Sequence, residues 1–184
     1  MKKCNNGAVH SLSMVRDEKK REKEFIEIYE KYHNDIFRFC MVKLSDRETS
    51  LDITQEVFLR FWKKFLEQDT HENVRAFLYQ IARNLIIDFY KKKKSIPIDN
   101  IQSFEKSEDF IHEVEKTLSF SIDAGKTLFL LQKLPESMRE VLTLRYLHEL
   151  SISEISTITG KSPGYVSTLI HRSLKKMREI IENQ

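Results

Sequence analysis

The sequence predicts an all-α protein with two small helical domains joined by a flexible acidic linker, the C-terminal domain being a helix-turn-helix. Only four glycines and three prolines occur among 184 residues, whereas a sheet protein needs a turn signal about every 8–12 residues. Apolar residues recur at the three- and four-residue spacing of helices in two separate stretches. Between these stretches, residues 96–127 lack that spacing and carry seven acidic residues against three lysines.

The composition also excludes several classes of protein. No GxGxxG motif and no P-loop motif occurs, so dinucleotide and P-loop nucleotide sites are not expected. The six histidines form no HExxH motif, and no GxSxG motif is present, so we expect no metal, no cofactor and no enzymatic activity. Two cysteines cannot build a disulfide framework, and no apolar run reaches the roughly 18 residues of a membrane span. A soluble, cytoplasmic protein is therefore expected.

The N-terminal domain is expected to follow a flexible tail of residues 1–22 and to occupy residues 23–94. Its first helix should begin near Glu22, because apolar residues recur at helical spacing from there, and the polar run 45–48 should end it. A second helix is expected from Thr49 or Ser50. The third helix should begin at Val74, after an Asn73 N-cap, and end in four lysines, with Tyr79 and Tyr90 exposed.

The C-terminal domain, residues 128–184, follows the acidic linker of residues 95–127. Pro135 is expected in the first turn of a helix, where its missing N–H costs nothing, and Tyr146 should continue the apolar stripe of that helix. Residues 151–154 read Ser-Ile-Ser-Glu, which is a capping box for a short helix that Gly160 should end. Ser162 and Pro163 then start the last helix. Two short helices around a tight turn predict a helix-turn-helix.

The net charge of +3 conceals a segregation of charge along the chain. The third helix and its tail, residues 74–94, carry six basic residues and one acid. Residues 161–178 carry five basic residues and no acid. Basic segments of this kind suit nucleic-acid phosphates, although a run of lysines at a helix end is more often simply solvated. On the second helix, Asp52, Gln55 and Glu56 form a polar patch that is either a solvated face or a docking surface for a partner helix.

Three stretches resemble bacterial sigma factors of the small, two-domain extracytoplasmic-function (ECF) type. Residues 52–62 read DITQEVFLRFW and are similar to the family's polymerase-docking helix. Residues 74–89 read VRAFLYQIARNLIIDF and are similar to the helix that reads and opens the promoter −10 element. Residues 134–178 resemble the C-terminal unit whose helix-turn-helix reads the −35 element.

The resemblance implies that the chain binds core RNA polymerase, at its clamp coiled coil and flap, and directs it to promoter DNA. Asp52, Gln55 and Glu56 would then contact the clamp. Residues 68–73 with Asn84 would hold a flipped −10 base, and Arg83 with Lys91–Lys94 would grip the backbone. The resemblance further implies an anti-sigma protein as a frequent partner in the family. The residues expected to contact the −35 DNA are Ser162, Tyr165, Ser167, Thr168, His171, Arg172 and Lys175.

The chain also departs from the family pattern. Leu51 stands where an acidic residue is common, and Ser167 and Leu169 replace a lysine and an arginine of the recognition helix. We therefore expect the isolated C-terminal domain to bind DNA less tightly than is usual for the family. An alternative is a helix-turn-helix regulator that binds an operator without polymerase, with residues 23–94 as a sensor bundle. An all-α enzyme is a third hypothesis, which lacks any clustered catalytic set.

Overall fold

The computed structural model describes the backbone of residues 6–67, 73–94 and 130–182, and the side chains within these ranges except those of residues 6–18 and 94. All its regular elements in these ranges are helical, which confirms the predicted all-α class. In order they are α1 (Asn6–Leu44), α2 (Arg47–Glu67), α3 (Val74–Lys94), α6 (Glu136–Leu142), the π-helical turn η1 (Thr143–Leu147), α7 (Ile152–Thr159) and α8 (Pro163–Glu182). The acidic linker predicted at residues 95–127 lies outside the described residues.

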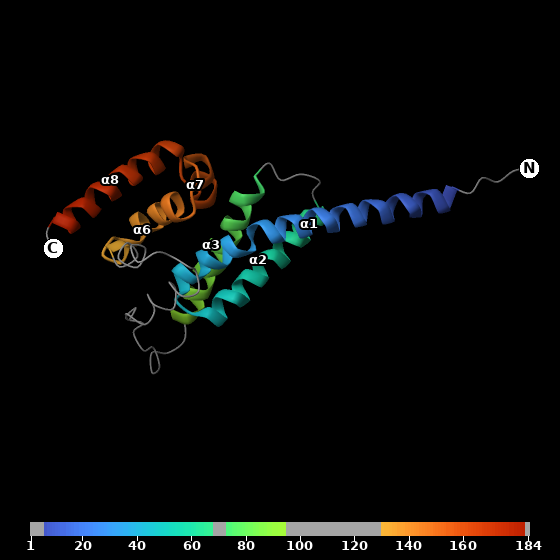
Figure 1. Cartoon of the computed structure of the whole chain (residues 1–184), viewed down its shortest axis with the longest axis horizontal. Helices are drawn as coiled ribbons and strands as arrows, with labels where there is room; N and C mark the ends of the chain where they lie inside the picture. Colours follow the sequence, from blue (N-terminus) through green and yellow to red (C-terminus); the bar gives the residue numbers. More distant parts are fainter. Residues whose placement is uncertain (1–5, 68–72, 95–129, 183–184) are drawn as a thin grey trace, which may run out of the picture.

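The N-terminal unit is a bundle of α1, α2 and α3, in which α1 extends well beyond its neighbours (Figure 1). Phe39, Phe61 and Leu78, one from each helix, are fully buried and form the centre of its core. The start of α1 at Asn6 differs from the expected start near Glu22. Residues 17–24 are mostly Lys, Arg and Glu, which favour helix without an apolar stripe, and Lys20 and Glu24 are in addition an i,i+4 ion pair.

The helix starts of this unit are set by capping side chains. Asn73 accepts a 2.9 Å hydrogen bond from the backbone N–H of Ala76, which confirms it as the cap of α3. The expectation that α2 begins at Thr49 or Ser50 was wrong, because Asp46 is the cap and α2 begins at Arg47. The Asp46 carboxylate accepts a 2.7 Å hydrogen bond from the Thr49 N–H. Hydrogen bonds from the hydroxyl and the N–H of Thr49 lower the pKa of that carboxyl.

The C-terminal unit contains the predicted helix-turn-helix, formed by α7 and α8. Ser151 and Glu154 form the complete capping box, and Gly160 ends α7 in the left-handed conformation with φ 68°. Tyr146 is more than half exposed, contrary to its expected place on the apolar stripe. The π-helical turn η1 adds a residue to the winding, so Leu144 is buried and Tyr146 points outward.

The two units pack against each other, with α3 lying between α2 and the C-terminal helices (Figure 1). Tyr79 of α3 is fully buried, so the expectation that it is exposed was wrong. Its hydroxyl lies 3.0 Å from Nδ1 of His148, which comes from the C-terminal unit. Cys40 of α1 is buried in the same core, and burial raises the pKa of its thiol to about 12.

Candidate nucleic-acid and protein interfaces

The outer face of α8, together with its N-cap Ser162, presents every residue that the sequence assigned to DNA contact in the C-terminal domain. Val166 and Ile170 are buried against the rest of the unit, so the opposite side of the helix faces outward. The assigned residues are all exposed: Ser162, Tyr165, Ser167, Thr168, His171, Arg172 and Lys175. The structure thus brings these side chains together on one accessible helix and its N-cap.

The start of α8 is held by local contacts that leave its surface open. The Ser162 hydroxyl accepts a 3.3 Å hydrogen bond from the Tyr165 N–H, as expected for an N-cap. The Lys161 ammonium lies 5.9 Å from the centre of the Tyr165 ring. Thr168 donates its hydroxyl proton to the carbonyl of Gly164 at 2.9 Å, so its oxygen remains available as an acceptor.

The residues of α3 that the sequence assigned to the −10 contact differ from one another in how exposed they are. Asn84 is exposed, with its amide accessible. Arg83 is only about one quarter exposed, because its guanidinium donates to both carboxylate oxygens of Glu140, from Nε at 3.0 Å and from Nη2 at 3.3 Å. Lys91 and Lys92 are exposed and Lys93 is half-buried. The assigned residues 68–72 lie outside the described part of the chain.

The polar patch on α2 borders an apolar groove between α1 and α2. Asp52 and Gln55 are exposed, while the half-buried Glu56 accepts a 2.7 Å hydrogen bond from Arg60. The groove has a volume of about 540 Å³. Its lining residues are Glu22, Phe25, Ile26, Tyr29, Gln55, Phe58, Leu59 and Trp62.

Three large apolar side chains of this groove are unusually accessible. Leu59 is 56% exposed and Ile26 is 48% exposed, and Tyr29 is 38% exposed. Exposed apolar side chains gathered in a groove indicate a contact with another molecule. The sequence analysis missed them, although Leu59 lies outside the apolar stripe of α2 and could have been recognised by that position.

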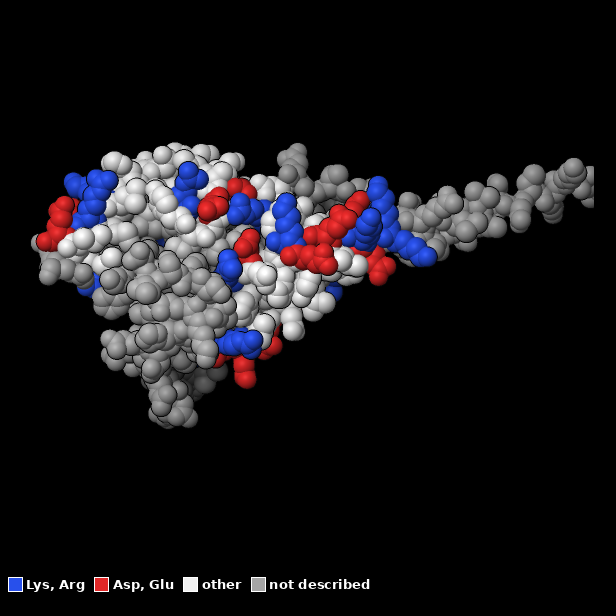
Figure 2. Space-filling view, in the orientation of Figure 1, with Lys and Arg blue, Asp and Glu red and all other residues white. Residues whose placement is uncertain are grey.

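Both signs of charge occur on the face of the molecule that Figure 2 draws. Figure 2 shows basic and acidic side chains interspersed along α1 rather than gathered into a field of one sign.

No group of three or more potential metal ligands occurs among the described residues. None of the described helices is both long enough and apolar enough to cross a membrane.

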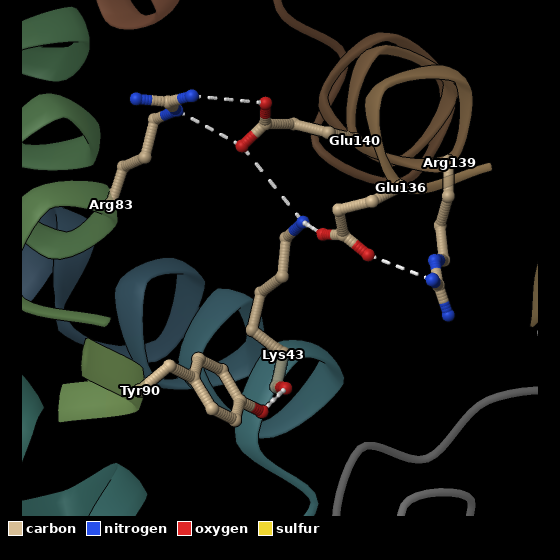
Figure 3. A network of polar contacts seen from close by, with 6 residues as sticks. All are labelled: Lys43, Arg83, Tyr90, Glu136, Arg139 and Glu140. Atoms are coloured by element: carbon tan, nitrogen blue, oxygen red, sulfur yellow. Dashed lines mark hydrogen bonds and ion pairs between the residues drawn. The ribbon is translucent and has the colours of Figure 1, made fainter. Parts of the chain in front are cut away.

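Polar contacts between the two units are the feature that sequence reasoning did not find. Figure 3 shows Lys43 of α1 and Arg83 of α3 pointing toward Glu136 and Glu140 of α6. Lys43 lies 2.7 Å from Glu136 and 3.9 Å from Glu140. Arg75 donates from its guanidinium to the backbone carbonyl of His148.

His148 lies at the centre of this contact and is almost completely buried. Its ring packs edge-on against Tyr79 and Phe39, with ring centres 5.3 and 5.5 Å apart. Burial, with the nearby charges of Arg75, Arg38 and Lys43, lowers the pKa of its imidazole to about 3. The ring is therefore neutral at physiological pH.

Comparison with known proteins gives the same two units. The model of sigma-70 region 2 matches residues 28–96, and the model of sigma-70 region 4 matches residues 126–177. The ECF RNA polymerase sigma factor SigM of Bacillus subtilis is 32% identical over 159 residues, which is 84% of this chain and 93% of SigM. SigW of the same organism is 28% identical over 90% of this chain and 93% of its own length.

Solved structures share the fold. CnrH, in complex with the cytosolic domain of CnrY, has a TM-score of 0.65 and 19% identity over 89% of this chain and 90% of its own. The Bartonella quintana sigma factor RpoE, in complex with the anti-sigma factor NepR, has a TM-score of 0.65 and 17% identity over 87% of this chain and 98% of its own. With the sequence identity to SigM and the two matching regions, the chain belongs to the family of ECF RNA polymerase sigma factors.

Proposed function

We propose that this chain binds core RNA polymerase and directs it to promoters, with the N-terminal unit (about residues 23–94) docking on polymerase and reading the −10 element. The C-terminal unit (about residues 128–184) reads the −35 element. The observation that carries this function is the pairing, on one chain, of an exposed basic helix-turn-helix with a separate helical unit that bears an accessible apolar groove. A regulator that binds an operator alone has no use for the second surface.

Polymerase docking is assigned to Asp52, Gln55 and Glu56 with the groove beside them. The carboxylates supply charge for a basic partner, and the exposed side chains of Leu59 and Tyr29 supply apolar area that a partner helix can cover. A coiled coil of the polymerase clamp offers such a helix, since amphipathic helices bind grooves through apolar anchors. An anti-sigma protein that covered the same groove would compete with polymerase.

Promoter contact is assigned to both units. The exposed Asn84 amide can pair with the edge of an unstacked base, and Arg83 with Lys91, Lys92 and Lys93 can neutralise phosphates. On α8, the exposed side chains of Tyr165, Ser167, Thr168 and His171 can reach base edges if this helix enters the major groove. Ser162, Arg172 and Lys175 complete that contact at the DNA backbone. A protein that acts on the chromosome with polymerase works in the cytoplasm.

Run-off transcription with core polymerase and genomic promoter fragments tests this function. The wild-type chain should support specific transcripts, and Asp52→Asn combined with Gln55→Ala should weaken polymerase binding about tenfold or more. Glu67→Gln is the matched control, since it removes one exposed carboxylate from the same helix about 22 Å along its axis. A folded chain that binds no polymerase would contradict the proposal, and operator binding by the chain alone would then favour the regulator.

A further inference from the structure

The apolar groove between α1 and α2 opens along a stripe of α1 that continues beyond it. Glu22, Ile26 and Tyr29 line the groove at intervals of four and three residues, and all three are exposed. Lys19 is also exposed, and it extends the same stripe by three residues toward the start of the helix. A helix bound in the groove and continuing along α1 therefore meets a glutamate and a lysine after the apolar side chains.

The projecting part of α1 has the same spacing in its sequence. The level at which α2 ends is marked by Arg21, whose guanidinium donates a 2.7 Å hydrogen bond to the carbonyl of Leu66. The helix before that level extends past the end of α2 (Figure 1). In the sequence of that part, Leu12 and Val15 continue the stripe backward at intervals of four and three residues. The stripe from position 12 to position 29 is therefore apolar at both ends and charged in its middle, with the spacing of a coiled coil.

This stripe is complementary to itself in one antiparallel register. When a second copy of α1 is laid antiparallel with its Lys19 opposite Glu22, its position 15 falls opposite Ile26 and its position 12 opposite Tyr29. Each charged position of the stripe then faces the opposite charge, and each apolar position faces an apolar residue. A parallel pairing in register would instead set Lys19 against Lys19 and Glu22 against Glu22, which is unfavourable. The pattern therefore favours an antiparallel pair.

The length of α2 agrees with the same register. Its twofold axis crosses α1 between positions 20 and 21, which is the level where α2 ends at the Arg21–Leu66 contact. Each bundle therefore occupies its own half of the paired helices. The projecting end of each copy then lies in the groove of the other, beside the α2 side chains of Phe58, Leu59 and Trp62. A twofold contact of this kind is closed and does not lead to fibres.

We propose that two copies of this chain associate through α1, each placing its projecting end in the other copy's groove. Charged residues in the middle of a coiled coil fix its register and orientation but lower its stability, so the association is weak and reversible. The groove is also the surface that we assign to polymerase docking, so the dimer masks it. This consequence rests on the proposed function, whereas the association itself does not. The chain thereby limits its own activity when it is abundant.

Sedimentation equilibrium of the full chain, without polymerase, measures the association. The average mass should rise from that of the 21.9 kDa chain toward twice this value as the concentration increases. Lys19→Glu sets a like charge opposite Glu22 at two symmetric places and should raise the dissociation constant of the dimer about tenfold. Glu22→Lys should have the same effect, because it sets a like charge opposite Lys19. A wild-type chain that stays monomeric at its highest soluble concentration would overturn the proposal.

The double variant is the decisive test of the register. Lys19→Glu combined with Glu22→Lys restores opposite charges and should return the dissociation constant to the wild-type value, which a poorly folded variant could not do. Lys31→Glu is the matched control, since it makes the same charge change at an exposed position on the opposite side of α1 and should leave the association unchanged. A double variant that associates as weakly as the single variants would overturn the antiparallel register.

Titration of core polymerase with the chain tests whether the dimer masks the groove. At total concentrations above the dissociation constant of the dimer, the wild type should saturate polymerase less than Lys19→Glu does, because only the monomer is competent to bind. Equal saturation by both would overturn the masking. A chain that binds no polymerase at any concentration would contradict the proposed function, and sedimentation would still report the association separately.

Discussion

Lowering the pH from about 7.5 to about 5 should destabilise the chain through the imidazole of His148. The pKa of this group is lowered from 6.5 to about 3 by burial and by the cations Arg75, Arg38 and Lys43. The unfolded chain binds a proton as the pH falls through 6.5, whereas the folded chain stays neutral until about pH 3. Stability is therefore complete above pH 6.5 and is lost progressively below it. At pH 5, about 1.5 units below 6.5, the loss is about 2 kcal/mol.

Urea unfolding followed by circular dichroism at both pH values measures this loss. His148→Gln keeps a polar side chain that cannot bind a proton, so the free energy of unfolding of this variant should depend less on pH, by about 2 kcal/mol. The exposed His171 gives the matched control, and His171→Gln should retain the wild-type dependence. Asp46 and Glu154, whose pKa values are lowered from 3.8 and 4.5, lose their contribution as the pH falls through those ordinary values, so most of it is still present at pH 5. Equal pH dependence in His148→Gln and the wild type would refute the reasoning.

Three further changes separate stability from DNA contact. Gly160→Ala should lower the free energy of unfolding by about 1 kcal/mol, because φ is 68° there and the added Cβ meets no atom within 4 Å, so only backbone strain changes. Urea unfolding measures this loss, and an unchanged unfolding midpoint would contradict the prediction. Asn84→Ala should reduce open-complex formation, detected by permanganate reactivity, while polymerase binding stays at the wild-type level; loss of both would indicate a structural role. Lys175→Gln should reduce the slope of log affinity against log salt concentration by about 1 if the lysine contacts a phosphate. The same slope in Lys175→Gln and the wild type would show that Lys175 does not contact a phosphate.

Local signals in the sequence predicted the parts of the fold that depend on local chemistry. The structure confirms the cap at Asn73, the capping box at Ser151 and the helix end at Gly160. These features were predictable because each is a contact between residues at most four positions apart. The start of α1 was predicted too late, near Glu22 instead of Asn6, because the prediction relied on the first apolar residues at helical spacing. Lys, Arg and Glu favour helix and can extend one without apolar residues. No sequence pattern predicted the π-helical turn at Thr143–Leu147, so the orientation of Tyr146 was predicted wrongly.

The contact between the units could not be predicted from sequence. Tyr79 and His148 are 69 positions apart, and Arg83 and Glu140 are 57 apart. Each residue alone is an ordinary polar side chain on a helix face, and periodicity reports only which side is apolar. The exposure of the α8 residues assigned to DNA contact was predictable from sequence, because it follows from the burial of Val166 and Ile170 on the opposite side of the same helix.

The burial of Cys40 gives the chain a built-in chemical reporter. A thiol with a pKa of about 12 is protonated at neutral pH and, lying inside the α1–α2 core, is out of reach of alkylating reagents. It becomes reactive only in molecules whose N-terminal bundle has opened. In a Cys4→Ser variant, the rate at which Cys40 is alkylated therefore measures how often this bundle opens locally, without an added probe.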